Sequence, residues 1–285
     1  MNIMVYVLAL IAAFLFALGT VLQQKGTLEV HLSGDDPKFF LNLLKTPIWL
    51  IGGASQCLGW IIQAVAFDKG SFIIVQTLMA TSIVMSLPLG RRLTNQIVTK
   101  KVWSGAALAV FGMAVFLSVA PKQSSGVTPV AHEWILGFVM TGLAVVLLLL
   151  LSKKAKPSLK ALFLGSAAGI IYALQATITK TFITVVGHGP LATLSSWTVY
   201  ALLLSAVIGF VFQQSALKTG VLAPAFASIN ALTLFASVLF GITIYDEVLS
   251  RGHGHLAIAI FGLAVDIAGI ILLTVSGNSK NSKLA

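Results

Sequence analysis

Asp266 is an acidic residue halfway along a long apolar run near the C-terminus, and it is the first candidate for chemistry in this sequence. An aspartate at the centre of a membrane helix costs about 2.5–3.5 kcal/mol on insertion scales. Such a side chain is expected to face other helices, where it can pair or contact water. We interpret Asp266 as the best candidate for binding a proton or a cation. A structural hydrogen bond between helices is the alternative.

Lys180 is a second ionisable residue within an apolar run, close to the end of that run. Its ammonium group could neutralise Asp266. It could also extend to the membrane surface while its aliphatic stem stays in the apolar phase. We favour the second interpretation.

Uncharged polar residues recur at spacings that place them on one face of a helix. Gln56 and Gln63 are seven residues apart, and Thr77 and Thr81 are four residues apart, so each pair shares a face. Taken singly, such residues often hydrogen-bond neighbouring helices, with an average of about 0.6 kcal/mol. As a set they predict a polar cavity near the membrane midplane that suits a small polar solute. The other candidates for this pathway are Gln23, Gln175, Asn230 and Thr233.

Three further carboxylates follow apolar runs and are expected at the outer membrane face: those of Asp68, Asp246 and Glu247. They could attract cations to an entrance, because a cluster of one charge sign raises the local concentration of counter-ions. Solvated loop residues are the alternative interpretation.

Neither catalysis nor a resident cofactor is expected. The sequence has a single cysteine, Cys57, and shows no Ser/His/Asp arrangement, phosphate-binding glycine loop or ATP-binding domain. His253 and His255 lack a fixed helical spacing that would support a metal site. We expect no enzyme, no cofactor and no metal centre.

The composition is that of a membrane protein. Hydrophobic residues make up 58% of the 285 positions and charged residues 9%, and the mean hydropathy is +0.99. Soluble domains carry about 25% charged residues, so this chain has too few to cover a surface that faces water. The net charge of +10 is interpreted as basic residues at the cytoplasmic membrane surface rather than as a nucleic-acid footprint.

Nine apolar runs must position these residues. They are residues 3–24, 47–67, 71–90, 102–119, 134–151, 159–186, 190–213, 221–244 and 255–276. Backbone that faces lipid must be helical, because no water is there to satisfy its hydrogen-bonding groups. The sequence therefore predicts an all-α polytopic membrane protein with nine transmembrane helices.

The lysines and arginines predict the orientation of these helices. With nine spans, fourteen of the eighteen basic residues fall on one side and three on the other, while Lys180 lies within a span. Cytoplasmic loops carry the excess of Lys and Arg. The N-terminus is therefore expected outside and the C-terminus in the cytoplasm.

An internal repeat relates the two halves of the chain. Gln63, Ala66 and Gly70 recur 150 residues later as Gln213, Ala216 and Gly220. At the same offset, residues 109–115 resemble residues 259–265. At a different spacing, and more weakly, residues 16–18 resemble residues 172–174. The division is a first repeat over 1–120, a linking helix over 121–157, a second repeat over 158–276 and a cytoplasmic tail over 277–285.

A single linking helix makes the second copy enter from the opposite side. The result is two inverted four-helix repeats joined by one helix, as in many secondary transporters, whose substrate sites lie near the midplane between the repeats.

The layout resembles that of the drug/metabolite transporter superfamily, nearest to its NIPA-like magnesium transporter and EamA-like branch. The residues that carry the resemblance are 44–49, 66–70 and 118–121, together with nine helices and an outside N-terminus. The sequence departs from the NIPA-like pattern at Gly59–Trp60 and at Arg91–Arg92, where that branch usually has glutamates.

The resemblance implies a secondary transporter of the plasma membrane that moves a small polar solute or cation by alternating access. Its partners would be the solute or ion and the lipid bilayer, without nucleic acid, and a homodimer is compatible with this class. A Mg²⁺ transporter or channel is one alternative. A non-transporting membrane scaffold or assembly subunit is another.

Overall fold

The computed structural model describes residues 3–29, 42–93, 99–119, 129–217, 219, 222–247 and 253–278. All the regular secondary structure of these residues is helical, which confirms the all-α prediction. The tail beyond residue 278 lies outside the described residues. The helices are α1 (Ile3–Glu29), α3 (Pro47–Lys69), α4 (Phe72–Met79), α5 (Thr81–Leu93), α6 (Lys100–Val119), α7 (Ala131–Ser152), α8 (Pro157–Val186), α9 (Pro190–Ser195), α10 (Trp197–Leu217), α11 (Leu222–Thr243) and α12 (His253–Asn278).

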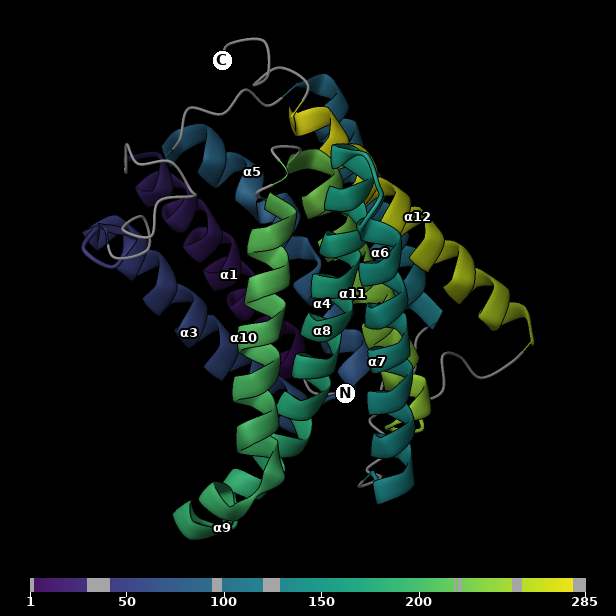
Figure 1. Cartoon of the computed structure of the whole chain (residues 1–285). Helices are drawn as coiled ribbons and strands as arrows, with labels where there is room; N and C mark the ends of the chain where they lie inside the picture. Colours follow the sequence, from purple (N-terminus) through teal and green to yellow (C-terminus); the bar gives the residue numbers. More distant parts are fainter. Residues whose placement is uncertain are drawn as a thin grey trace.

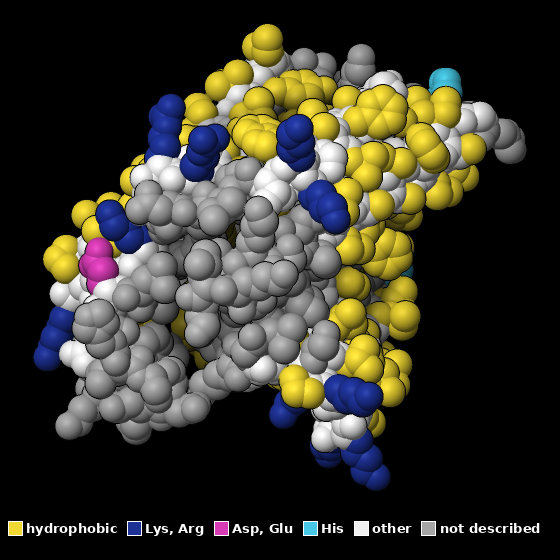
Figure 2. All heavy atoms as spheres, turned by 90° about the horizontal axis from the view of Figure 1, so that it is seen from above, with side chains coloured by type: hydrophobic (Ala, Val, Ile, Leu, Met, Phe, Trp, Pro, Cys, Tyr) yellow, Lys and Arg dark blue, Asp and Glu magenta, His cyan; other side chains and the backbone are white. Residues whose placement is uncertain are grey.

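In the described part of the chain, seven helical segments are long and apolar enough to cross a membrane. They are Ile3–Gln23, Pro47–Lys69, Phe72–Leu93, Lys100–Val119, Ala131–Ser152, Leu159–Val186 and Gly254–Leu272, with two shorter apolar helices at Trp197–Gln213 and Ser228–Thr243. Large apolar side chains cover the outside of the bundle, such as Leu143 of α7 and Leu203 of α10, both 64% exposed. Figure 2 shows hydrophobic side chains around the rim of the molecule. The chain is therefore a polytopic integral membrane protein.

Two of the predicted continuous helices are interrupted in the structure. The run 71–90 forms α4 and α5, which meet in a tight turn at Ala80, whose backbone N–H bonds the carbonyl of Thr77 three residues back at 3.2 Å. The run 190–213 forms α9 and α10, because Ser196 adopts an extended conformation and its hydroxyl accepts from the N–H of Thr198. The serine hydroxyl satisfies one of the first N–H groups of α10 and so fixes where that helix begins.

The centre of the bundle is formed by α4 and α8. Every residue of α4 from Phe72 to Leu78 is buried. Of the residues in the most apolar stretch of each helix, 72% are buried in α8 and 22% in α7. Around this centre, α1 packs along α3 and α5, and α8 packs along α7, α10 and α11 (Figure 1).

The closest helix pair is α6 and α12, which cross through glycines. A Cβ atom on Gly112 would collide with the backbone nitrogen of Asp266, and one on Gly262 would lie 2.5 Å from the backbone nitrogen of Phe116. Rising residue numbers on one helix meet falling numbers on the other, so the pair is antiparallel. Small residues at such crossings let membrane helices approach closely and gain dispersion contacts.

Candidate functional site

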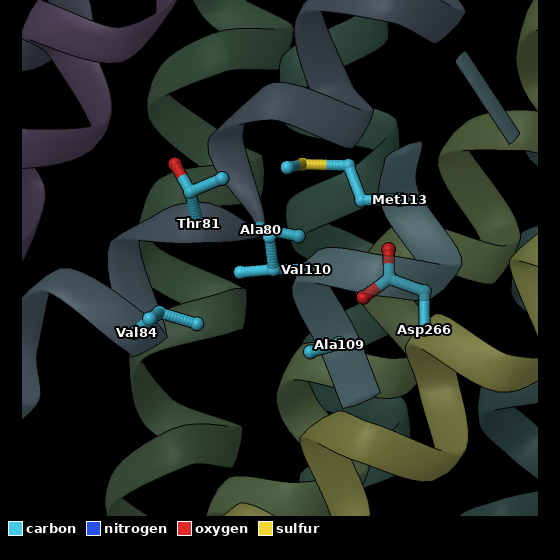
Figure 3. A pocket seen from close by; sticks show the side chains of 7 residues that line it. All are labelled: Ala80, Thr81, Val84, Ala109, Val110, Met113 and Asp266. Carbon is cyan, nitrogen blue, oxygen red and sulfur yellow. The ribbon is translucent and has the colours of Figure 1, made fainter. Parts of the chain in front are cut away.

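Asp266 lies at a small cavity between α12, α6 and the α4–α5 turn. Its side chain is nearly fully buried, and its Oδ2 atom has no hydrogen-bond partner among the described residues. The residues that line the cavity are Ala80, Thr81, Val84, Ala109, Val110, Met113 and Asp266 (Figure 3). The cavity has a volume of about 10 Å³, which is near the minimum that holds one water molecule.

The close α6–α12 crossing positions this carboxylate. Because Gly112 has no side chain, the backbone of α12 at Asp266 lies directly against α6, and the carboxylate extends toward the interrupted helix (Figure 3). At the interruption, the hydroxyl of Thr81 donates to the carbonyl of Leu78 at 2.6 Å. Pro88, about two turns further on in α5, has no N–H to donate to the carbonyl of Val84. Asp266 therefore faces the least regular backbone of the α4–α5 span.

Other buried polar atoms of the described residues share this unsatisfied state. They are Nε2 of Gln76 in α4, Oγ1 of Thr141 in α7 and Oγ of Ser237 in α11. A buried donor or acceptor without a partner costs about 1–3 kcal/mol. The interior thus carries polar groups that the bundle itself does not satisfy.

A second buried carboxylate, that of Glu247, lies just beyond the end of α11. Its Oε1 atom is 2.7 Å from the ammonium of Lys180 and accepts from the backbone N–H of Phe72 at 2.7 Å. Its Oε2 atom accepts from the hydroxyl of Ser71 at 2.7 Å and from the N–H of Ile73 at 2.9 Å. The carboxylate therefore caps the N-terminus of α4 and neutralises a lysine of α8 at the same time. Both interactions favour negative charge at this point.

Aromatic rings enclose the lysine of this ion pair. The ammonium of Lys180 lies 4.2 Å from the ring centroid of Tyr245 and 5.9 Å from that of Phe72. The Tyr245 hydroxyl donates to the carbonyl of Thr177 at 2.7 Å. Burial raises the pKa of Tyr245, so the phenol stays a neutral donor. A cation over an aromatic face is stabilised most where water is excluded, as it is here.

The local backbone explains why Glu247 reaches α4. Asp246 has a φ of 50°, in the left-handed region that asparagine and aspartate tolerate better than most residues. After this turn, the N–H of Glu247 bonds the carbonyl of Gly241 at 2.9 Å. The chain is thereby folded back over the end of α11, and the Glu247 side chain points into the bundle.

Two sequence predictions are corrected by this arrangement. Lys180 neither extends to the membrane surface nor pairs with Asp266: its side chain is 10% exposed and its ammonium binds Glu247. Glu247 is not a solvated loop carboxylate, since its side chain is fully buried. The other two predicted entrance residues, Asp68 and Asp246, are exposed, and Asp68 lies 3.9 Å from the ammonium of Lys69. The sequence signal that was missed is the presence of two opposite charges in apolar surroundings, which a protein buries together.

The remaining predicted pathway residues are spread over several interfaces. Thr81 lines the Asp266 cavity, whereas Gln56 donates to the hydroxyl of Thr20 at 3.2 Å between α3 and α1. Thr233 donates to the carbonyl of Gly169 at 3.2 Å, which links α11 to α8. The others lie against neighbouring helices without lining this cavity: Gln23 packs on Gly52, Gln63 is buried in α3, Thr77 donates to the carbonyl of Ile73, and Gln175 and Asn230 are half-buried.

Among known proteins, the chain is similar to an uncharacterized protein of Corynebacterium glutamicum. The two are 26% identical over 222 residues, which is 77% of this chain and 76% of that protein. No protein-family model matches the chain, and no solved structure matches it. The similarity extends over most of both proteins and carries no functional assignment.

Proposed function

We propose that the protein is a secondary transporter that moves a small polar solute or cation across the plasma membrane by alternating access. The observation that carries the proposal is the buried carboxylate of Asp266, unpartnered at Oδ2, at a cavity beside an interrupted membrane helix. Ionisable residues inside membrane spans are rare and mark solute or ion pathways. Interrupted helices at such depth are tolerated where they line a cavity or are buried in protein.

The proposed architecture is nine transmembrane helices in two inverted four-helix repeats, and the α6–α12 crossing supports it. Gly112 meets Asp266, and Gly262 meets Phe116. Gly112 and Gly262 are 150 residues apart, as are Phe116 and Asp266, which is the offset of the sequence matches. Each contact is thus paired with its counterpart in the other repeat, as a two-fold axis between the helices requires.

A second pair of contacts joins residues that match between the proposed repeats, the glycines at the offset of 150 and the aromatic residues through the weaker match of 16–18 with 172–174. A Cβ atom on Gly59 of α3 would lie 3.1 Å from the ring of Phe16 in α1, and one on Gly209 of α10 would lie 2.6 Å from the ring of Tyr172 in α8. These residues belong to matching places in the two proposed repeats. The linking helix is then α7, which is also the least buried of the candidate spans.

The lining of the cavity favours a proton over Mg²⁺ as the species that Asp266 binds. Of its seven residues, only Asp266 and Thr81 have a side-chain oxygen. Mg²⁺ requires near-octahedral coordination by six oxygens and gives up its water reluctantly, which a cavity of about 10 Å³ does not accommodate. A proton needs only the carboxylate. We therefore favour a proton, because the lining offers too few oxygen ligands for Mg²⁺.

The proposed orientation places the basic face in the cytoplasm, with the N-terminus outside and the C-terminus inside. Lysine and arginine side chains gather on the face seen in Figure 2, and the C-terminal end of α12 lies at the same end of the bundle in Figure 1. Basic residues stand at the helix ends of the proposed cytoplasmic side, such as Arg91 in α5, Lys100 in α6 and Lys153 after α7. The opposite end holds the Lys180–Glu247 pair.

Reconstitution tests the proposal. Purified protein in proteoliposomes is exposed to imposed gradients of pH and of candidate amino acids, amines, sugars and cations, and the charge that moves is recorded on solid-supported membranes. We expect a current or uptake for at least one solute, with loss of that activity in Asp266→Asn. Glu133→Gln is the control, since Glu133 caps α7 away from the cavity and glutamine can keep that bond.

The rival is a non-transporting membrane scaffold, which the small volume of the interior cavity favours. In the transport proposal the same small cavity belongs to an occluded conformation. A correctly folded protein that moves no solute under any imposed gradient would contradict transport and support the scaffold.

A further inference from the structure

The short helix α4 connects the two buried carboxylates. Its N-terminus is held by Glu247, and its C-terminus ends at Ala80, which lines the cavity of Asp266. Eight residues of helix span about 12 Å. At Ala80 the N–H bonds the carbonyl three residues back, and a short tightening of this kind inside a span often marks a hinge.

The polar contacts at the N-terminus of α4 converge on one side chain, while the buried residues of α4 pack against the core. Glu247 makes four polar contacts with three segments: two N–H groups of α4, the hydroxyl of Ser71 and the ammonium of Lys180 in α8. Three charged residues are neighbours in sequence of Ser71 or Glu247 but do not belong to this cluster, because their side chains are exposed. They are Asp68, Lys69 and Asp246. A buried charge pair is stable only with its partners in place or with both charges hydrated. The network shown is the closed, dry arrangement, and separating the pair requires water to reach both charges.

We propose that the Lys180–Glu247 pair at the N-terminus of α4 keeps this end of the bundle closed, so that the cavity of Asp266 cannot be reached from this side. We call the pair the latch. When the pair separates, water reaches its two charges, and α4 is released from α11 and α8. The route from this end to the cavity then opens. This inference rests on the proposed function, since it describes how one side of the transporter opens.

A single reporter cysteine tests the latch without a known solute. Val75 is fully buried in α4, between the latch and the cavity, and cysteine is similar to it in size. The exposed Cys57 is replaced in Cys57→Ser, and Val75→Cys is then treated with a membrane-impermeant methanethiosulfonate in cells, so that only the outer side is reached. The measured quantity is the rate of modification.

The decisive variants remove the charges of the pair. We expect slow modification of Val75→Cys in the parent and modification at least about tenfold faster in Glu247→Gln, since loss of the pair shifts the population toward the open state. Glu133→Gln is expected to leave the rate unchanged. A fast rate in the parent would overturn the proposal, because this end would then not be closed.

The double variant Lys180→Met/Glu247→Gln covers the case in which one unpaired charge prevents folding. Removing both charges avoids an uncompensated buried ion, so the double variant is expected to fold. Fast modification in the double variant supports the latch, and slow modification in a stable double variant overturns it. Faster modification without any solute transport would instead count against the proposed function and leave the latch intact. Transport with unchanged modification would count against the latch alone.

Discussion

Asp266 and Glu247 are two buried carboxylates that differ in their hydrogen-bond partners. Glu247 accepts three hydrogen bonds from protein donors and binds one ammonium, while Oδ2 of Asp266 has no partner in the described part of the chain. A fully satisfied buried charge fixes a structure, whereas an unsatisfied one is retained at a cost in stability. We therefore assign a closing role to Glu247 and a binding role to Asp266.

Asp266→Leu is expected to stabilise the protein while removing transport. The substitution removes a polar group that costs about 1–3 kcal/mol when buried without a partner. The measurement is the temperature of thermal aggregation in detergent, together with uptake by proteoliposomes. Phe116→Leu, at the corresponding place of the other proposed repeat, is expected to lower that temperature because it removes buried ring area. A large loss of stability in Asp266→Leu would show that the aspartate is structural.

Ser71→Ala is expected to lower stability through the latch. The serine hydroxyl donates to a buried carboxylate at 2.7 Å, and hydrogen bonds to charged groups contribute about 1.5–3 kcal/mol. The same change at the exposed Ser118, whose hydroxyl bonds only a carbonyl of its own helix, is expected to change stability by less than about 0.5 kcal/mol. Thermal aggregation of the two variants compares them directly. Equal effects would mean that the Ser71 bond contributes nothing specific.

At the scale of elements, the α6–α12 crossing and the α4–α5 turn together position the cavity. The crossing requires glycine because backbone meets backbone there, and the turn places Ala80 and Thr81 opposite Asp266. Neither element forms the site by itself. The cavity arises because α12 is pressed against α6 at the depth where the α4–α5 span is irregular.

Gly112→Ala is expected to be strongly destabilising. Its new methyl group would collide with the backbone of Asp266, and overpacking of this kind costs about 1–3 kcal/mol or more. Gly142→Ala in α7 is the matched control, since nothing lies within 4 Å of its added methyl group and alanine is the better helix former by about 0.5–1 kcal/mol. We expect a lower yield and aggregation temperature for the first variant and no loss for the second. A well-folded Gly112→Ala would contradict the close crossing.

At the scale of the whole molecule, the two ends of the bundle differ in charge. One end carries the gathered lysine and arginine side chains, and the other carries a buried, self-neutralised pair. In the proposed orientation the basic end faces anionic lipid headgroups in the cytoplasm, which attract Lys and Arg by about 1 kcal/mol each. The latch then faces outward.

Reporter fusions test this topology. Green fluorescent protein at the C-terminus is expected to fluoresce and alkaline phosphatase at the same place to be inactive, because the C-terminus is proposed to be cytoplasmic. Fusion after residue 126, between α6 and α7, is expected to give the reverse pattern. Active phosphatase at the C-terminus would contradict the proposed orientation.

Composition and apolar runs were sufficient to assign this chain to the membrane proteins. Its few charges and long apolar runs required membrane-spanning helices, because backbone in lipid has no other way to satisfy its hydrogen bonds. Asp266 was identifiable for the same reason, since a charge in the middle of an apolar run cannot be explained by solvent. The match of residues 109–115 with 259–265 contained both glycines of the α6–α12 crossing, although it did not indicate that they touch.

Only the tertiary structure decided which buried groups meet. Lys180 was expected to extend to the membrane surface, with neutralisation of Asp266 as the alternative, yet its partner is Glu247, 67 residues further along the chain. The turn at Ala80 was also hidden, because α4 and α5 form one continuous apolar run in the sequence. The apolar residues of a run show that it can lie in lipid. They do not show which other helix it contacts, and the pairing of buried charges depends on those contacts. That pairing gave Glu247 and Lys180 their place in the latch and left Asp266 alone at the cavity.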